Sequence, residues 1–332
     1  MNTHSHRSNR SIRPDHRSKP ESEWITIRGR SYEVLEQLSV PNRGRWKVRD
    51  PEPTPNGTLR TAIVLPVSKE ENQLRKSVDR LPKNHNGLPN LVSWESKSGT
   101  TYIVVSYCEG TDLATYLSRF KKDGVSPISV WEAVRRVKSL AHSLADLHTI
   151  CGVVHGDIKP ANLILPSDPG ALFPIDFGSS WQMEKTARRS IGDGTNRHYS
   201  SPEVFLELPK VNARADQFSV GVVLFEMLTL ELPYIGLGGR AGHPGFELAA
   251  KDYRSPSQLI GSRCQVPPSI MQQLDEVVRR SIALDPAKRF PTMKRFAQEL
   301  DRVWLELQKK ADRPPQSETF FQTVIRWVRN SN

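Results

Sequence analysis

Four polar residues in two short segments of the sequence could together carry out one kind of chemistry. Asp157, Lys159 and Asn162 lie in the segment HGDIKPANLIL, which begins at His155, and Asp176 follows fourteen residues after Asn162 in the segment Ile-Asp-Phe-Gly. Transfer of a phosphoryl group to a hydroxyl needs a carboxylate that takes the acceptor's proton, metal ligands beside the nucleotide, and a cation near the γ-phosphate. The short loop offers all three groups, and an aspartate on a turn after an apolar strand suits a magnesium ligand.

The order and spacing of these two segments resemble the eukaryotic-type protein kinase family, and the resemblance extends from about residue 30 to about residue 305. The resemblance implies a serine/threonine-type protein kinase that uses ATP and Mg2+. Asp157 would be the catalytic base, and Lys159, two residues later, follows the serine/threonine pattern. Asn162 and Asp176 would bind the metal, with Asp176 as its principal ligand.

The resemblance also implies where the nucleotide would bind. The backbone of Ser106 and Cys108 falls where kinases hydrogen-bond adenine, and Asp112 falls where an acidic residue meets the ribose. Ala62 and Ile164 correspond to the apolar roof and floor of the purine slot.

Three later landmarks agree with the family pattern and concern its fold. Glu203 ends a Ser-Pro-Glu segment that resembles the close of the activation segment. Asp216 begins an apolar stretch that resembles the buried helix anchoring the catalytic loop. Arg289 would pair with Glu203, and a buried pair of this kind is costly to break on one side.

The sequence departs from the family pattern at three places. Val64 takes the position of the lysine that holds the α- and β-phosphates. The span 38–46 keeps only Gly44 of the usual three glycines, and Trp46 replaces the small valine that covers adenine. Gly156 replaces the arginine of His-Arg-Asp, which argues against control by activation-loop phosphorylation and not against catalysis.

A substitute for the missing lysine could come from another basic residue near the same strands. We hypothesise that one such residue reaches the phosphates, while the alternative for each is a solvated surface charge. The candidates are Lys47, Arg43, Arg45 and Lys69. For the helix glutamate that normally pairs with the lysine, we choose Glu71, followed by Glu70.

Two alternatives to an active protein kinase stay open. Loss of electrostatic stabilisation at the phosphates costs several orders of magnitude in rate, so the chain could be a pseudokinase that acts as a binding or scaffold module. His-Gly-Asp is also typical of kinase-like enzymes that phosphorylate aminoglycosides or choline. Glu203, Asp216 and Arg289 speak against such a small-molecule phosphotransferase, because they build a peptide-binding segment that those enzymes generally lack.

Composition describes a basic globular protein. The chain has 332 residues, a formal net charge of +11 and three cysteines with no pair spacing. We expect a reducing, cytoplasmic location. The basic residues form no long run, so nucleic-acid binding is not expected, and no segment predicts a transmembrane helix. The partners expected are ATP and an unidentified protein substrate.

The pattern of elements predicts an α+β, bilobal, protein-kinase-like fold with a small β-rich N-lobe and a larger helical C-lobe. The predicted domains are a disordered basic tail (1–22), a kinase domain (23–305, with its N-lobe at 23–108 and its C-lobe at 109–305), and a C-terminal extension (306–332). Apolar residues at helical spacing predict helices over 69–81, 129–149, 214–230, 267–283 and 292–309. The glycine-rich stretch within 235–262 predicts a loop.

Overall fold

The computed structural model describes most of the predicted kinase domain. The residues described are 23–38, 45–53, 59–67, 80, 82, 85–123, 128–166, 170–183, 197–206, 211–261 and 265–310. The predicted tail, the residues of the C-terminal extension after 310, nearly all of the predicted helix at 69–81 and the hypothesised Arg43, Lys69, Glu70 and Glu71 lie outside the described residues.

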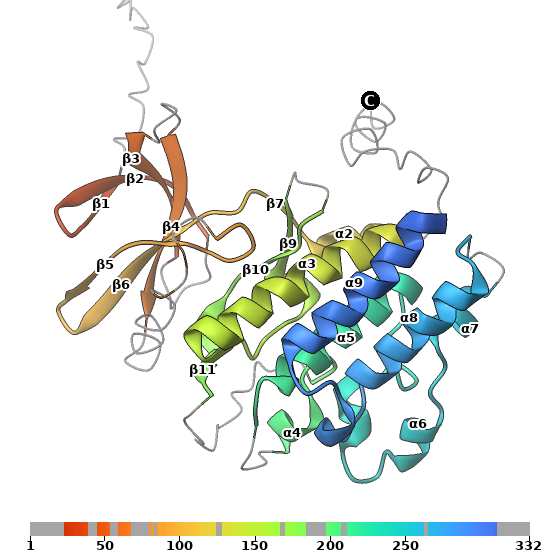
Figure 1. Ribbon diagram of the computed structural model, residues 1–332. Helices are drawn as coiled ribbons and strands as arrows, with labels where there is room; N and C mark the ends of the chain where they lie inside the picture. The colour runs from red at the N-terminus through yellow and green to blue at the C-terminus, as the bar shows by residue number, and fades with distance from the viewer. Residues whose placement is uncertain are drawn as a thin grey trace, which may run out of the picture.

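The N-terminal region is an antiparallel sheet (Figure 1). Within the described residues it has six strands in the order β1-β2-β3-β4-β6-β5. The strands are β1 (Trp24–Ile27), β2 (Arg30–Gln37), β3 (Trp46–Pro53), β4 (Leu59–Val67), β5 (Leu91–Lys97) and β6 (Thr100–Ser106). Arg28 and Gly29 both have positive φ, which is the backbone that a tight hairpin between β1 and β2 requires.

The sheet has its own apolar core. Side chains directly opposite each other on neighbouring antiparallel strands lie on the same face, so each register pair can be buried together. Val48 faces Ala62, and Val64 faces both Trp46 and Val104. Apart from Trp46, which is partly exposed, these side chains are buried, and Tyr32 is buried in the same cluster.

The C-terminal region is helical, as the sequence pattern predicts. Its longer helices are α2 (Leu113–Asp123), α3 (Val130–Asp146), α5 (Arg214–Thr229), α8 (Pro268–Ser281) and α9 (Met293–Lys310). Helices α3 and α9 lie side by side, and α5 is covered by α3 and α8 (Figure 1). The bilobal kinase-like fold is therefore confirmed, with a β-rich first part and a helical second part.

Helix α3 shows how local sequence sets the ends of an element. The Ser129 side chain accepts a hydrogen bond from the Glu132 N–H and so caps the first turn. After Asp146 the chain continues as one π-helical turn, Leu147–Cys151, and stops at Gly152 in the left-handed conformation (φ 64°). The helix predicted over 129–149 is confirmed, and glycine ends it because its backbone adopts positive φ without strain.

Short strands connect the two regions and carry the loops of the site. Strand β7 (Gly110–Asp112) pairs with β9 (Leu163–Pro166), which pairs with β10 (Phe173–Pro174). Strand β8 (Val153–Val154) pairs with β11 (Trp181–Gln182). Gly110 is required here, because a Cβ atom on it would collide with the carbonyl group of Leu165. The catalytic loop thus begins after β8 and ends at β9.

The glycine-rich stretch differs from the predicted loop. It contains a 3-10 helix at Gly238–Gly242, α6 (Glu247–Lys251) and α7 (Pro256–Ile260). The loop prediction was therefore wrong. Gly238 and Gly239 pack directly against the backbone of His198 and Ser200, where a larger side chain would collide. Glycine here indicates close packing of backbone on backbone.

Among the described helices, none combines the length and apolar character needed to span a membrane.

Candidate active site

The catalytic loop is held by one buried carboxylate. Asp216, in the first turn of α5, accepts hydrogen bonds from the backbone N–H groups of His155 and Gly156, each at 2.8 Å. It also lies 2.8 Å from Nε2 of His148 and is 1% exposed. The predicted anchoring of the loop by the buried helix is therefore confirmed.

Charge and hydrogen bonds keep Asp216 ionised despite its burial. Burial acts to raise its pKa, but the hydrogen bond and charge of His148, together with the Gly156 N–H, outweigh it and lower the pKa. A carboxylate that accepts several hydrogen bonds holds the loop backbone more firmly than a neutral acid would. The loop is therefore fixed by α5 before any substrate binds.

Gly156 adopts a backbone conformation that suits glycine. Its φ is +78°, in the left-handed region. A Cβ atom on it would lie 2.8 Å from both the Ser179 carbonyl oxygen and Cε3 of Trp181, and closer still to Cζ3. The indole of Trp181 therefore occupies the space beside Gly156 that a side chain would need.

Asp157, Lys159 and Asn162 form one hydrogen-bonded group. Nζ of Lys159 donates to Oδ2 of Asp157 at 2.6 Å. The amide nitrogen of Asn162 donates to the same oxygen at 2.8 Å and to the Asp157 carbonyl at 2.9 Å. The structure thus brings together three of the residues expected to do the chemistry and orients the Asp157 carboxylate through two donors.

Asp176 lies beside this group. The Ile175 N–H donates to the Asn162 carbonyl at 2.9 Å, which places Asp176 next to the end of the loop. Asp176 itself has a φ of +63°, an uncommon conformation for a residue other than glycine and one that is often retained at functional sites. Phe177, the next residue, packs its ring 4.6 Å from the ring of the buried His155.

The donor set suits magnesium. Mg2+ prefers oxygen ligands and is usually held by one or two protein groups together with substrate phosphates and water. In the described part of the chain, no hydrogen bond engages the amide oxygen of Asn162, because both bonds of its amide group use the nitrogen. No group of three or more His, Cys, Asp or Glu side chains forms a metal site among the described residues. Asn162 and Asp176 carry the oxygen atoms that fit the expected metal.

The backbone predicted to bind adenine, at Ser106 and Cys108, lies at the end of β6 and just after it. The Ser106 N–H donates to the Asn90 carbonyl at 2.9 Å, and the Tyr107 N–H donates to the Thr61 carbonyl at 3.1 Å. These bonds fix the strand just before Cys108. Burial, followed by the nearby Glu109 carboxylate, raises the pKa of the Cys108 thiol to about 11, so the thiol stays protonated and unreactive near neutral pH.

The remaining expected nucleotide residues come from both regions. Asp112 is the register partner of Ile164, so β7 and β9 place the ribose candidate and the floor candidate side by side. Oδ1 of Asp112 accepts from the Thr115 N–H at 2.8 Å and thereby caps α2. Ala62 is buried in the sheet opposite Ser106. Asp112 thus has a structural task in addition to its expected contact with ribose.

The structure separates the described candidates for the missing cation. Nζ of Lys47 lies 4.2 Å from the centre of the Tyr107 ring. The guanidinium of Arg45 instead crosses to Asp176, with Nη1 at 3.2 Å from Oδ2 and Nη2 at 3.1 Å from Oδ1. Of these two, Arg45 is the one that reaches the expected metal ligand.

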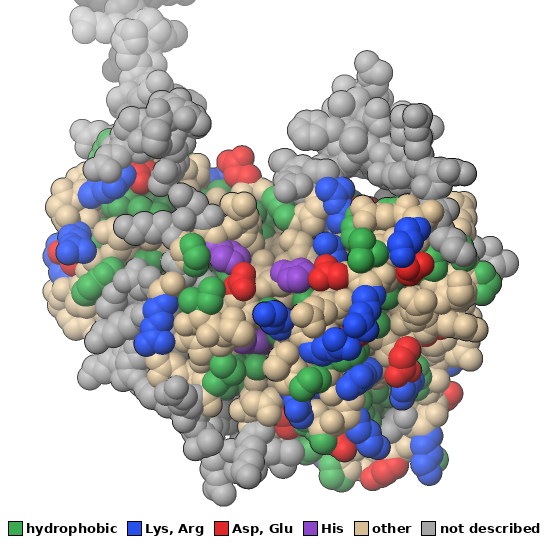
Figure 2. All heavy atoms as spheres, viewed as in Figure 1, with side chains coloured by type: hydrophobic (Ala, Val, Ile, Leu, Met, Phe, Trp, Pro, Cys, Tyr) green, Lys and Arg blue, Asp and Glu red, His purple; other side chains and the backbone are tan. Residues whose placement is uncertain are grey.

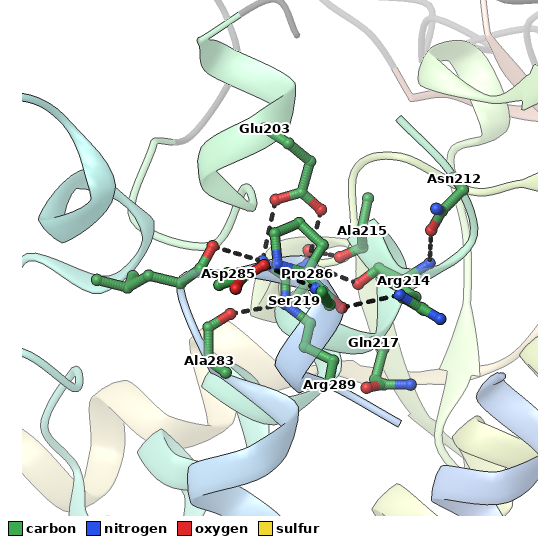
Figure 3. Close-up of polar contacts among 12 residues, drawn as sticks. Glu203, Asn212, Arg214, Ala215, Gln217, Ser219, Ala283, Asp285, Pro286 and Arg289 are labelled. Carbon is green, nitrogen blue, oxygen red and sulfur yellow. Dashed lines mark hydrogen bonds and ion pairs between the residues drawn. The ribbon is translucent and has the colours of Figure 1, made fainter. Parts of the chain in front are cut away.

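The Ser-Pro-Glu segment, which ends at Glu203, is fixed by a buried ion pair (Figure 3). Arg289 donates to both carboxylate oxygens of Glu203, at 2.6 and 2.9 Å, and also to the carbonyls of Ala283 and Arg214. The Arg289 side chain is fully buried, and that of Glu203 is 3% exposed. The predicted pair is therefore confirmed, and its donors and acceptors are satisfied.

A second buried acid supports the same segment. Glu226 lies in the later part of the buried helix α5, where it accepts from the Tyr199 hydroxyl at 2.5 Å and from Nζ of Lys121 at 2.9 Å. The N–H of Gly239 donates to the His198 carbonyl at 2.9 Å. His198 and Tyr199 are therefore held by Gly239 and by α5, from two sides.

Comparison with known families decides the class of protein. The family model described as the protein kinase domain matches residues 67–302, which is more than half of the chain. The chain belongs to the protein kinase family. The match begins at Val67, the last residue of β4, so it leaves out Val64 and the span 38–46, where the sequence departs from the family pattern.

The curated relatives are kinases by name, and several are serine/threonine-protein kinases by name. "Ribosomal protein S6 kinase alpha-4" of Mus musculus is 28% identical over 225 residues, covering 66% of this chain and 28% of that protein. "Serine/threonine-protein kinase PknJ" of Mycobacterium tuberculosis is 27% identical over 216 residues, covering 63% of this chain and 34% of that protein. The kinase described here thus spans about a third or less of the length of these two relatives.

A solved structure shows the same fold. The crystal structure of the Mycobacterium tuberculosis PknI kinase domain superposes with a TM-score of 0.57 at 20% identity, covering 84% of this chain and 98% of that chain. At this identity the likeness concerns the fold alone, and it extends over both the sheet and the helical region.

Two contacts of the site do not follow from the sequence pattern. Trp181 lies beyond the Asp-Phe-Gly segment, and nothing in the sequence pattern indicates that its ring packs on Gly156. Arg45 was one of four equal candidates by sequence, and its pairing with Asp176 depends on how the two regions sit together. Contacts between distant segments of this kind require the fold.

Proposed function

We propose that the chain is a protein kinase that transfers the γ-phosphoryl group of ATP to a serine or threonine hydroxyl of a protein, with Mg2+ as its metal. The observation that carries this proposal is the hydrogen-bonded group of Asp157, Lys159 and Asn162 beside Asp176. These are the base, the cation and the two metal ligands that phosphoryl transfer to a hydroxyl needs.

Each side chain has a role that its contacts support. Asp157 accepts the proton of the attacking hydroxyl, and its two donors keep the carboxylate turned into the site. Lys159, already beside Asp157, offsets negative charge that develops on the transferred group. Asn162 and Asp176 would hold the metal, which neutralises phosphate charge when it is bound. Ser106, Cys108, Asp112, Ala62 and Ile164 would contact adenosine.

The segment at 197–206 favours a protein acceptor over a small molecule. Its end is tied down by Glu203 and Arg289, and Tyr199 is tied to Glu226. A small-molecule phosphotransferase has no need of a rigid surface at this place. We infer that the substrate is a protein. The cytoplasmic location of the kinase and the absence of a nucleic-acid partner stay predictions.

A pseudokinase is the second candidate, and one observation favours it. Val64 is fully buried between Trp46 and Val104, so this position of β4 offers no cation to the phosphates. A protein without that cation could still bind nucleotide, or hold partners, without useful transfer. The two candidates differ in one property: an active kinase transfers phosphate from ATP by a reaction that requires Asp157, and a pseudokinase does not.

The test is phosphate transfer by the purified 332-residue chain. The protein is incubated with γ-labelled Mg-ATP and a basic protein acceptor, and the labelled residues are identified, with aminoglycosides and choline as separate acceptors. We expect labelled phosphoserine or phosphothreonine and none in folded Asp157→Asn protein. Equal labelling in wild type and variant would support the pseudokinase instead. Label on a small molecule alone would reassign the substrate class.

A further inference from the structure

The place of the phosphate-holding cation is closed on β4. The Val64 side chain is 0% exposed, and its register partners Trp46 and Val104 are apolar. This position of β4 supplies no charge to a bound phosphate. Any cation that meets the phosphates must therefore enter from elsewhere.

Arg45, the residue just before β3, reaches the expected metal ligand from the sheet side. Its carbonyl accepts from the Leu38 N–H at 2.7 Å, which ties the backbone of Arg45 to the residue that follows β2. Its guanidinium crosses to the helical region and meets Asp176 with one nitrogen on each carboxylate oxygen. The position of Arg45 is therefore set by the sheet, and its charge is delivered beside the expected metal ligands.

The Arg45–Asp176 pair is of a kind that can exchange. Its N–O distances of 3.1 and 3.2 Å are longer than about 2.7–2.9 Å, the usual length of charge-assisted hydrogen bonds. The two side chains are 35% and 30% exposed, so water screens their attraction. A guanidinium also matches two phosphate oxygens as well as it matches a carboxylate.

We propose that Arg45 is the residue that binds the nucleotide phosphates in place of the lysine absent at Val64, and that it rests on Asp176 when no nucleotide is bound. This inference depends on the proposed nucleotide site and adds a specific residue to it. A different outcome is that Arg45 blocks Asp176 and so hinders nucleotide binding. The two differ in the sign of the effect when Arg45 is removed.

The experiment measures binding rather than turnover. Isothermal titration calorimetry gives the Kd of the full chain for adenosine and for ADP, each in the absence of divalent metal, and for Mg-ADP. The variants are Arg45→Gln and Arg45→Lys. Arg49→Gln is the matched control, because Arg49 lies on β3 four residues after Arg45, and its guanidinium binds Glu33 at 2.8 Å. Thermal unfolding checks that each variant is folded.

We expect Arg45→Gln to leave the Kd for adenosine unchanged and to weaken ADP binding by about tenfold or more, as expected for one charge-assisted contact. Arg45→Lys should keep part of the affinity, because it keeps the charge but loses the planar fork. Arg49→Gln should match wild type.

Two results would overturn the inference while leaving the nucleotide site intact. Unchanged ADP affinity in Arg45→Gln would show that Arg45 does not meet the phosphates. Tighter ADP binding in that variant would show that it blocks Asp176. If wild type bound neither adenosine nor ADP, the proposed function itself would fail, and the role of Arg45 with it.

Discussion

At the scale of single residues, the site depends on where individual atoms can fit. Oδ2 of Asp157 receives two donors because Lys159 and Asn162 follow at spacings that turn both side chains back toward it. Gly156 precedes this carboxylate with a left-handed backbone, and the Trp181 ring closes over it. The glycine that replaces the family's arginine is thus matched by a tryptophan that fills the space.

Replacing Gly156 should test this packing. Gly152→Ala is the control, because Gly152 also has positive φ (64°) but a Cβ atom there would meet nothing within 4 Å. We expect Gly152→Ala to lower the free energy of unfolding by about 1–2 kcal/mol through backbone strain alone. Gly156→Ala should cost about 1–3 kcal/mol more, because its Cβ collides with Trp181. Urea unfolding measures both values.

A second variant separates the collision from other effects. In the Trp181→Leu background the ring is gone, so the extra cost of Gly156→Ala over Gly152→Ala should shrink. An extra cost that stays the same with and without the ring would contradict the assigned contact.

At the scale of elements, helix α5 organises the site. Its first turn carries Asp216, which holds the catalytic loop, and its later part carries Glu226, which holds Tyr199. Arg289, in the loop between α8 and α9, then fixes Glu203 at the start of α4 (Pro202–Phe205). A buried helix thus links the loop expected to do the chemistry with the segment expected to receive the substrate.

Removing one partner of the Glu203–Arg289 pair should be far more costly than removing both. Arg289→Met leaves the Glu203 carboxylate buried without a counter-charge, and we expect it to lower the free energy of unfolding by about 3–5 kcal/mol. The double variant Glu203→Leu with Arg289→Met should recover part of that loss. A double-mutant cycle by denaturant unfolding measures the coupling, and additive losses would contradict a direct interaction.

Much of this arrangement could be predicted from the sequence, for physical reasons. The helices at 129–149 and 214–230 follow from apolar spacing, and the roles of Asp216 and Arg289 follow from their place in a family pattern. The close packing of Gly238 and Gly239 was misread as a loop, because a glycine's small size suits both a flexible segment and a tight contact. The Arg45–Asp176 pair joins residues 131 positions apart, which local pattern alone does not reveal.

At the scale of the whole molecule, part of the basic charge in the described residues is paired with acidic side chains. Figure 2 shows Lys and Arg side chains lying beside Asp and Glu over the helical region. On α9, Glu299 pairs with Arg295 and with Arg302, and Asp301 pairs with Lys138 of α3. Exposed pairs of this kind contribute little to stability.

The stability of the whole molecule should depend on pH through His155. Burial lowers its pKa, and the neighbouring Asp216 and Asp157 carboxylates, which act to raise it, do not offset the burial. Below about pH 6.5 the unfolded chain therefore binds a proton that the folded protein does not, and the free energy of unfolding falls by up to about 1.4 kcal/mol per pH unit. Asp216 adds a further loss only near pH 4 and below, because its folded pKa is lowered.

Replacing His155 should flatten this dependence. His155→Phe keeps a ring against Phe177 but cannot take a proton, so its free energy of unfolding should change less between pH 7 and pH 5.5 than that of wild type. His243→Gln, at an exposed position, controls for the loss of a histidine elsewhere. Chemical denaturation across this range gives the slopes, and parallel slopes for wild type and His155→Phe would refute the assignment.

The central claim is that the Asp157 group still transfers phosphate although β4 carries no lysine. The most direct measurement is the initial rate of phosphate transfer from Mg-ATP to a protein acceptor by wild type and by Asp157→Asn, prepared and assayed together. Loss of a general base commonly costs about 10²- to 10⁴-fold, so we predict a fall of at least about a hundredfold with folding unchanged. Equal rates in the two proteins would contradict the assignment of Asp157 and with it the proposed kinase activity.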